Sequence, residues 1–330
     1  MRRRWRWTLG ILGVLLVAFA ALFVWFVRNP LEAFERSRRR ELLSAGFVRS
    51  DLGAGEERIA LFVAGEGPGL LFLHGLGDQA GSWASIAPAF AGRYRVFVAD
   101  LPGHGESGPA GDELEMSTIV AGAERLLDVA AAEGPATIVG NSLGAWLATL
   151  LARERPERVA RLVLVNGGAL RGEGGGPSLA PKDRAEAGRL MALLRDPSSP
   201  AVPGFVLDDV IRRAADGPIS KLGRDLPGLE AHLLDGRLGA IATPVDLLWG
   251  SSDRLIPLDY ARRMLAELPA ARLTEVERCG HVPQVECPDR FLPALERVLA
   301  LPPPAPAPAT PDGETPESPA ITEVTEVAAP

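Results

Sequence analysis

The chain has 330 residues, of which 47% are hydrophobic, so it is long and apolar enough to bury a globular core. Its net charge is −7, and residues 1–45 carry nine arginines against three glutamates, which leaves the remainder strongly acidic. Such a domain lacks the basic surface that a nucleic-acid partner requires, so we expect no nucleic-acid partner. The two cysteines and four histidines form no metal-ligand spacing, so we also expect no metal.

The N-terminus predicts a membrane anchor. Residues 1–7 are basic, and residues 8–27 contain no charged side chain. At about 1.5 Å per residue, a helix of this length spans the roughly 30 Å hydrocarbon layer. A cleavable signal peptide is the alternative, because residues 18–20 (Ala-Phe-Ala) resemble a cleavage site. Cleavage there would leave the apolar residues 22–27 as the new terminus, so we expect a retained anchor.

Arginines lie on both sides of the apolar segment, four before it and five after it. The leading cluster is closer and gains the α-amino charge, which favours a cytoplasmic N-terminus and a domain on the extracytoplasmic side. Residues 28–50 are interpreted as a basic linker lying against anionic headgroups. The apolar residues of 31–43 have only loose helical spacing, so a helix and a plain linker both stay open. A chain starting near Leu43 is expected to be soluble and active.

From residue 51 on, short apolar runs alternate with helical patterns. This alternation predicts a mostly parallel sheet covered by helices on both faces. The core is assigned to residues 51–166 and 243–300. The predicted strands are residues 59–63, 70–73, 96–99, 136–139, 162–165, 245–249 and 273–276.

Two glycine-rich turns follow strands in the first half of this domain. The turn His74-Gly75-Leu76-Gly77 could present the backbone N–H of Leu76 to a developing oxyanion. The second turn, residues 100–108, contains G-x-G-x-x-G. No helix opens there, because residues 109–112 continue the loop, so a dinucleotide site is excluded. We interpret His104 in this loop as structural.

Gly140-Asn141-Ser142-Leu143-Gly144 is a G-x-S-x-G segment between a predicted strand and a predicted helix. A serine at such a corner sits on a tight turn that exposes its hydroxyl, while glycines on both sides let the backbones approach. The pattern predicts Ser142 as a nucleophile. The N–H of Leu143, at the start of the helix, is the second candidate oxyanion donor.

Residues 167–242 are not needed by the sheet and are expected to form a helical cap over its carboxyl edge. The predicted helices are residues 182–194, 206–215 and 229–238. Apolar side chains of the cap could face a substrate or simply pack on the core: Met191, Leu193, Leu194, Phe205 and Leu207.

A serine nucleophile needs a base and a group that orients the base. His281 is the candidate base, and Asp253, which follows the predicted strand 245–249, is the candidate acid. Cys279 and Cys287 flank the histidine. They could form a disulfide in an oxidising compartment or serve as small buried hydrophobes, and both readings stay open.

The last 30 residues, 301–330, contain nine prolines and no lysine or arginine. This composition predicts an extended or disordered tail that cannot bury a core.

The order Ser142, Asp253, His281 and the turn at Leu76 resemble the α/β-hydrolase superfamily over about residues 55–300. The resemblance implies an α/β-hydrolase fold and a serine hydrolase that cleaves carboxylic esters through an acyl-enzyme, with no cofactor. Asn166 lies where some of these enzymes keep the acid, but an amide does not stabilise an imidazolium comparably.

Some branches of the superfamily fit poorly. Haloalkane dehalogenases and epoxide hydrolases have an aspartate in place of Ser142, and the cap tyrosines of the latter are missing here. The anchor and domain order resemble membrane-bound monoacylglycerol lipases, which implies a small-molecule substrate such as a lipid or monoacylglycerol-like ester. The alternatives are a C–C bond hydrolase, a small-ester esterase, and a non-catalytic membrane-tethered binding protein.

Overall fold

The computed structural model of the protein describes residues 2–172, 178–268 and 270–305. Most of the predicted tail, residues 301–330, and part of the glycine-rich start of the cap therefore lie outside the described residues.

Eight strands of the described chain form one sheet, in the order β1-β2-β4-β3-β5-β6-β7-β8. The strands are β1 (Val48–Leu52), β2 (Ile59–Ala64), β3 (Gly69–Leu73), β4 (Arg95–Ala99), β5 (Ala136–Asn141), β6 (Val159–Val165), β7 (Val245–Gly250) and β8 (Arg272–Val276). β2 pairs antiparallel with β1 and β4, and the other neighbouring strands pair parallel. The mostly parallel sheet expected from the sequence is confirmed.

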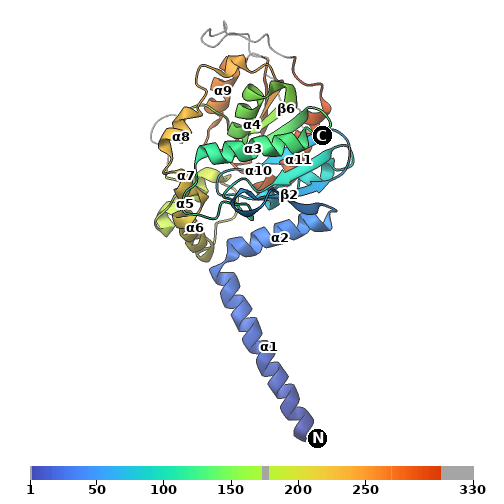
Figure 1. The fold of residues 1–330 in the computed structure, drawn as a ribbon. Helices are drawn as coiled ribbons and strands as arrows, with labels where there is room; N and C mark the ends of the chain where they lie inside the picture. The colour runs from blue at the N-terminus through green and yellow to red at the C-terminus, as the bar shows by residue number, and fades with distance from the viewer. Residues whose placement is uncertain (1, 173–177, 269, 306–330) are drawn as a thin grey trace, which may run out of the picture.

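Alternate side chains of the strands pack on opposite faces of the sheet, as the period of two along a strand requires. Leu71 and Leu73 of β3 join a core with α3 (Met116–Ala130), α4 (Leu143–Glu154) and α9 (Leu258–Glu267). Leu70 and Phe72 join the opposite core. That second core includes the short helices η2 (Ala80–Trp83) and η3 (Ala87–Phe90) and the last helix, α11 (Pro288–Ala300). α11 follows the short helix α10 (Pro283–Glu286) in the sequence. Figure 1 shows α3 and α4 in front of the sheet and α11 behind it.

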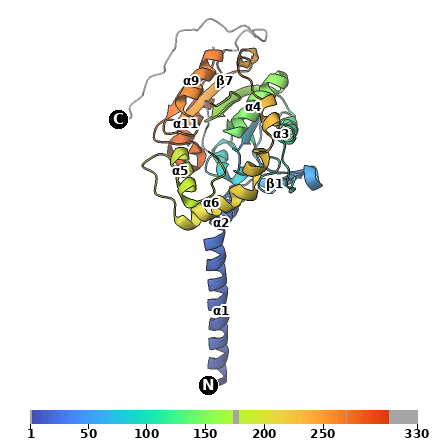
Figure 2. The same cartoon turned by 90° about the vertical axis from the view of Figure 1, so that its left-hand side faces the viewer.

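The segment between β6 and β7 is helical, as expected for the cap. It contains α5 (Arg184–Leu194), α6 (Gly204–Asp216), α7 (Pro218–Leu222), α8 (Leu226–Ala231) and η5 (Leu238–Ala240). Figures 1 and 2 show α5–α7 gathered on one side of the domain. The expected helix over residues 229–238 is wrong. The side chain of Asp225 caps α8 earlier in the chain, and Gly236 (φ 69°) forms a turn within the expected range.

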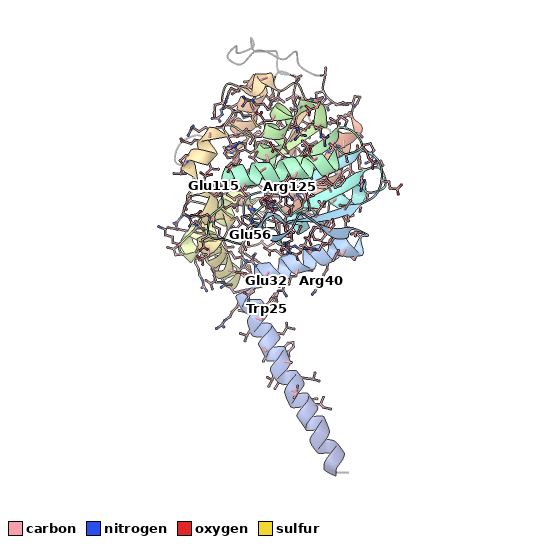
Figure 3. The ribbon with its side chains drawn as sticks, viewed as in Figure 1. Trp25, Glu32, Arg40, Glu56, Glu115 and Arg125 are labelled. Carbon is pink, nitrogen blue, oxygen red and sulfur yellow. A yellow bond between two sulfur atoms is a disulfide. The ribbon has the colours of Figure 1, made fainter. Side chains whose placement is uncertain are left out.

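The N-terminal segment forms two helices. α1 (Arg2–Arg28) projects from the domain, and its residues 11–28 are long and apolar enough to cross a membrane. α2 (Pro30–Ser44) then runs across the base of the domain, so residues 28–50 are largely helix and not a plain linker. Leu42 of α2 is fully buried, while Arg40 points away from the sheet (Figure 3).

Candidate active site

Ser142 lies at the corner between β5 and α4 with φ 54° and ψ −115°. A non-glycine residue at positive φ is strained, and such strain is typical of a nucleophile elbow. The flanking glycines are required by close approach. A Cβ on Gly140 would lie 2.2 Å from the Gly144 carbonyl oxygen, and a Cβ on Gly144 would lie 2.3 Å from the Leu73 oxygen. The tight corner leaves Ser142 half-buried between buried neighbours.

The side chains of Asp253 and His281 are joined across the ends of β7 and β8. His281 Nδ1 lies 2.7 Å from Asp253 Oδ2, and both side chains are buried. The other oxygen, Oδ1, accepts the backbone N–H groups of Leu255 and Ile256, each at 2.9 Å. These bonds hold the carboxylate in place. A proton on Nδ1 leaves Nε2 of the imidazole as the free basic nitrogen.

Asn141 ties the serine corner to the histidine loop. Its Nδ2 donates to the His281 carbonyl oxygen at 3.0 Å, and its Oδ1 accepts from Gln284 Nε2 at 3.1 Å. Among the described residues, no hydrogen bond joins the Ser142 hydroxyl to the His281 ring. In unliganded enzymes such catalytic hydrogen bonds are often long and shorten in the substrate complex.

The turn after β3 lies against Ser142. A Cβ on Gly75 would lie 3.2 Å from Ser142 Cβ, and Leu76 follows directly. Leu143 is the first residue of α4, so its N–H has no partner within that helix. The two candidate oxyanion donors therefore belong to the two segments that meet at Ser142, and their role stays a prediction.

Asn166, set aside from the sequence as a candidate acid, makes contacts between two loops of the site that the sequence did not predict. It is fully buried at the end of β6 with φ 48°. Its Oδ1 accepts the Gly250 N–H at 2.8 Å, and its Nδ2 donates to the Gly280 carbonyl oxygen at 2.7 Å. It thus connects the strand before Asp253 with the residue before His281. Its place after a core strand was the one available signal.

His104 does not join this group. Its Nδ1 lies 2.9 Å from the Pro102 carbonyl oxygen, and its ring packs edge-on to His74 with centroids 5.2 Å apart. Burial lowers the pKa of His104 to about 3, so the ring is neutral at physiological pH. These contacts agree with a structural histidine.

The cap contacts the site through its backbone and through α7. The His281 N–H donates to the Leu194 carbonyl oxygen at 2.7 Å, and the Arg254 N–H donates to the Leu193 oxygen at 3.1 Å. Ile219 of α7 covers the turn after β3, since a Cβ on Gly77 would lie 2.9 Å from its side chain. The end of α5 and the start of α7 thus border the site on two sides.

The cap also contacts the N-terminal helices. Phe26 near the end of α1 packs against Phe205 of α6, with ring centroids 6.3 Å apart. The buried Asp209 of α6 accepts the Leu31 N–H at 3.0 Å, in the first turn of α2. Arg213 of α6 pairs with Glu35 of α2 at 2.7 Å. The cap is therefore joined to both N-terminal helices, to α1 by an aromatic contact and to α2 by polar contacts.

No cluster of three or more histidine, cysteine or acidic side chains suited to a metal ion occurs within the described ranges.

Residues 70–294 match the model of the alpha/beta hydrolase family. The chain belongs to this family. It is 31% identical over 264 residues to a 2-hydroxy-6-oxononadienedioate/2-hydroxy-6-oxononatrienedioate hydrolase of Cupriavidus pinatubonensis, covering 72% of this chain and 84% of that protein. It is 32% identical over 283 residues to an uncharacterized protein of Mycobacterium tuberculosis, covering 75% and 80%.

Two solved structures share the fold closely. A membrane phospholipase A, described as a bacterial virulence factor, superposes with a TM-score of 0.69 at 27% identity, covering 89% of this chain and 97% of that one. A 2-hydroxy-6-oxo-6-phenylhexa-2,4-dienoate hydrolase from Rhodococcus sp. strain RHA1 superposes with a TM-score of 0.63 at 25% identity, covering 76% and 98%. The family resemblance inferred from the four motifs is thereby confirmed.

Proposed function

We propose that this α/β hydrolase cleaves carboxylic esters of lipids, monoacylglycerol-like in kind, at a membrane surface. The observation that carries the hydrolytic part is the buried Asp253–His281 pair beside the strained corner at Ser142. In this proposal Ser142 is the nucleophile, His281 the general base and Asp253 its orienting acid.

The reaction follows from these roles. The His281 Nε2 takes the proton of the Ser142 hydroxyl as the oxygen attacks the ester carbonyl carbon. The N–H groups of Leu76 and Leu143 stabilise the oxyanion, each worth about 3–4 kcal/mol. Collapse expels the alcohol, which takes its proton from His281, and leaves an acyl-enzyme. Water deprotonated by His281 then attacks the acyl carbonyl, and Ser142 leaves with the proton.

The lipid substrate is supported by the contact between α1 and the cap. Phe26 packs on Phe205 of α6, and α6 contacts both α5 and α7, the two cap helices that border the site. An anchor in the bilayer would hold the cap at the lipid surface. The alignment with the membrane phospholipase A covers 89% of this chain. Residues 45–303 alone make up a smaller share, so the alignment extends beyond the hydrolase core and the cap. That likeness supports a lipid ester over a water-soluble one.

A second candidate reaction is hydrolysis of a C–C bond. Two curated relatives near 30% identity are named as a 2-hydroxy-6-oxononadienedioate/2-hydroxy-6-oxononatrienedioate hydrolase and a 2-hydroxy-6-oxo-6-phenylhexa-2,4-dienoate hydrolase. Their alignments cover about three quarters of the chain, which is consistent with the core without the N-terminal helices. The anchor and its contact with the cap therefore favour the ester.

We place the catalytic domain on the extracytoplasmic side of the membrane. The disulfide between Cys279 and Cys287 supports this side, because disulfides persist in oxidising compartments and are rare in the cytosol.

A fluorophosphonate probe tests the nucleophile. We expect the wild-type chain to be labelled and Ser142→Ala to be unlabelled, with an unchanged melting temperature. Labelling that persists in Ser142→Ala would move the nucleophile to another serine. An unlabelled wild-type chain would favour a non-catalytic binding protein.

Substrate class is then measured with p-nitrophenyl esters of graded length. A pocket that buries acyl carbons gains about 0.8 kcal/mol per CH₂, so kcat/KM should rise over several carbons beyond acetyl. The alternative reaction, hydrolysis of a C–C bond, is measured in the same assay series with 2-hydroxy-6-oxo-6-phenylhexa-2,4-dienoate. A kcat/KM that peaks at acetyl, or turnover of the dienoate above that of every ester, would replace the lipid-ester proposal.

A further inference from the structure

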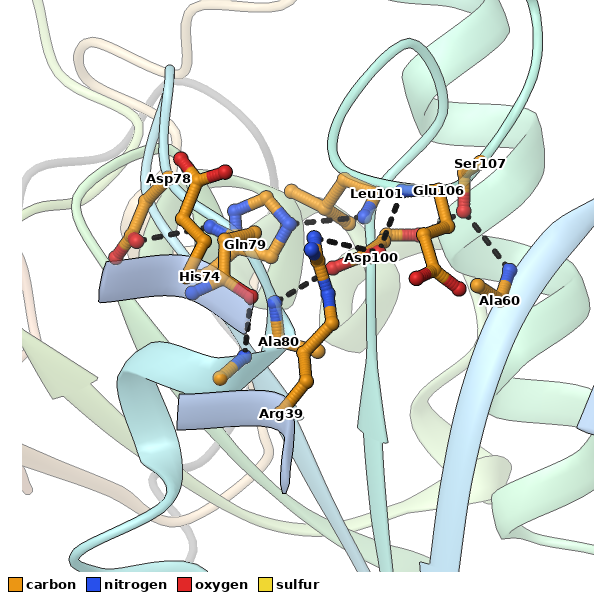
Figure 4. A network of polar contacts seen from close by, with 12 residues as sticks. Arg39, Ala60, His74, Asp78, Gln79, Ala80, Asp100, Leu101, Glu106 and Ser107 are labelled. Carbon is orange, nitrogen blue, oxygen red and sulfur yellow. Dashed lines mark hydrogen bonds and ion pairs between the residues drawn. The ribbon is translucent and has the colours of Figure 1, made fainter. Parts of the chain in front are cut away.

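The turn that carries Leu76 is held at both ends by the corner after β4. At its start, His74 Nε2 accepts the Leu101 N–H at 2.9 Å. Just beyond its end, the Ala80 N–H donates to Asp100 Oδ1 at 2.6 Å (Figure 4). Because Nε2 accepts, the His74 proton lies on Nδ1, which donates to the Gly75 carbonyl oxygen at 2.8 Å. Asp100 and Leu101, which are consecutive in the sequence, thus hold the turn at its two ends.

Asp100 is enclosed by backbone. Its side chain is fully buried, and its Oδ2 accepts the Glu106 N–H at 2.7 Å. Gly105 (φ 54°) lies so close that a Cβ there would be 2.2 Å from Asp100 Oδ2. Burial raises the pKa of Asp100 above its ordinary value, and the nearby Arg39 guanidinium opposes this rise. A buried carboxylate of this kind needs a positive partner to stay ionised.

That partner comes from α2. Arg39 Nη2 lies 3.4 Å from Asp100 Oδ2, and the arginine side chain is only 12% exposed. α2 packs tightly on η2 at this point, since a Cβ on Gly81 would lie 2.8 Å from Arg38 Cβ. Glu35, Asp78, His104 and Glu106 also interact electrostatically with this carboxyl group, and none of these four is a cation at neutral pH.

We infer that Arg39 is a positioning residue for the turn at Leu76, acting through Asp100, and that α2 is therefore part of the active-site scaffold. Asn29 alone separates α2 from α1, so the helix that would enter the bilayer leads directly into this support. The inference rests on the proposed function for the role of the turn. The order of the turn itself is measurable without any reaction.

The catalytic test compares Arg39→Ala with Arg40→Ala in the full chain. Arg40 is the matched control, since it is exposed on the same helix. Contacts to an oxyanion form only in the transition state, so Arg39→Ala should lower kcat and the fluorophosphonate labelling rate on the order of tenfold while KM changes less than about twofold. Arg39→Lys, which restores the positive charge, should recover part of the loss. Arg40→Ala should match wild type.

Hydrogen exchange of residues 74–82 measures the turn directly. We expect faster exchange there in Arg39→Ala than in Arg40→Ala, with unchanged exchange in α9 as the reference for an intact fold. If Arg39→Ala loses protection in α9 as well, Arg39→Met, which keeps the side-chain stem, takes its place in both measurements.

A folded Arg39 variant with wild-type kcat and wild-type exchange at residues 74–82 would overturn the inference. Failure of the proposed function looks different. In that case the wild-type chain would resist the fluorophosphonate, while the Arg39 variant would still loosen residues 74–82 and the positioning role would stand.

Discussion

The backbone of Ser142 adopts a conformation that costs about 1–3 kcal/mol for a residue with a side chain. The cost persists because the surrounding contacts hold it, including Asn141, whose amide bonds to the His281 carbonyl oxygen. Strain of this kind is local and leaves a local signature in the sequence. The glycines around Ser142 therefore predict the corner from five residues alone.

Asn166 has a similar positive φ but no such signature. Its two partners, Gly250 and Gly280, lie 84 and 114 residues further along the chain. Only the folded sheet brings them together. The sequence therefore predicts the residues proposed for chemistry better than the residue that holds their loops in register.

Asp78, which follows the turn at Leu76, gives a prediction for pH. Desolvation raises its pKa to about 7 from 3.8, and the nearby acids Glu35 and Asp100 act in the same direction. The folded chain therefore binds this proton more tightly than the unfolded chain. Its contribution to stability is full below about pH 4 and is lost as the pH rises through 7.

Asp78→Asn removes this dependence. Between pH 5 and 8 the melting temperature of the wild-type chain should fall relative to that of the variant, measured by differential scanning fluorimetry. Asp208→Asn, at an exposed carboxylate of α6 that pairs with Arg184, is the control and should keep the wild-type slope. Parallel curves for wild type and Asp78→Asn would show that Asp78 is not desolvated.

At the scale of elements, the sequence predicts strands better than it predicts α2. The predicted strands that became β2 to β7 are short apolar runs, mostly buried on both faces of the sheet, whereas the polar and largely exposed β1 was not predicted. In α2 only Pro30 and Leu42 are buried, while charged side chains such as Glu35 and Arg39 also contact the domain. A helix that contacts its domain through ion pairs has few apolar residues at regular spacing, so its hydrophobic pattern is too weak to predict it.

The loop that carries His281 is closed by a disulfide between Cys279 and Cys287, eight residues apart in sequence. Closing a loop of this size stabilises a fold by about 2–3 kcal/mol. We expect Cys279→Ala/Cys287→Ala to lower the melting temperature by roughly 5 °C and to reduce kcat, because His281 lies inside the loop.

Dithiothreitol provides the matched control for this element. It should lower the melting temperature and kcat of the wild-type chain and leave the double alanine variant unchanged. A wild-type chain that contains the disulfide by mass spectrometry but keeps its melting temperature after reduction would contradict the prediction.

At the scale of the whole molecule, the N-terminal helices, the cap and the turn form a connected unit. α2 contacts the cap through Glu35 and Arg213 and contacts the turn through Arg39 and Asp100. An anchor joined to a domain by a plain linker could be removed near Leu43 without consequence. The structure argues against that expectation, because Leu42 is buried in the core and Arg39 pairs with the buried carboxyl group of Asp100.

Two shortened chains separate the alternatives. A chain beginning at Asn29 retains α2 and should keep kcat within about twofold of the full chain on a soluble ester. A chain beginning at Ala45 loses Leu42, a deletion worth about 2–5 kcal/mol, together with the partner of Asp100. It should melt well below the longer chain and, where still folded, show a kcat reduced on the order of tenfold.

Equal kcat and equal melting temperature for the two chains would mean that α2 only spaces the domain from the anchor. Loss of activity in both would instead assign the requirement to α1, whose Phe26 contacts the cap.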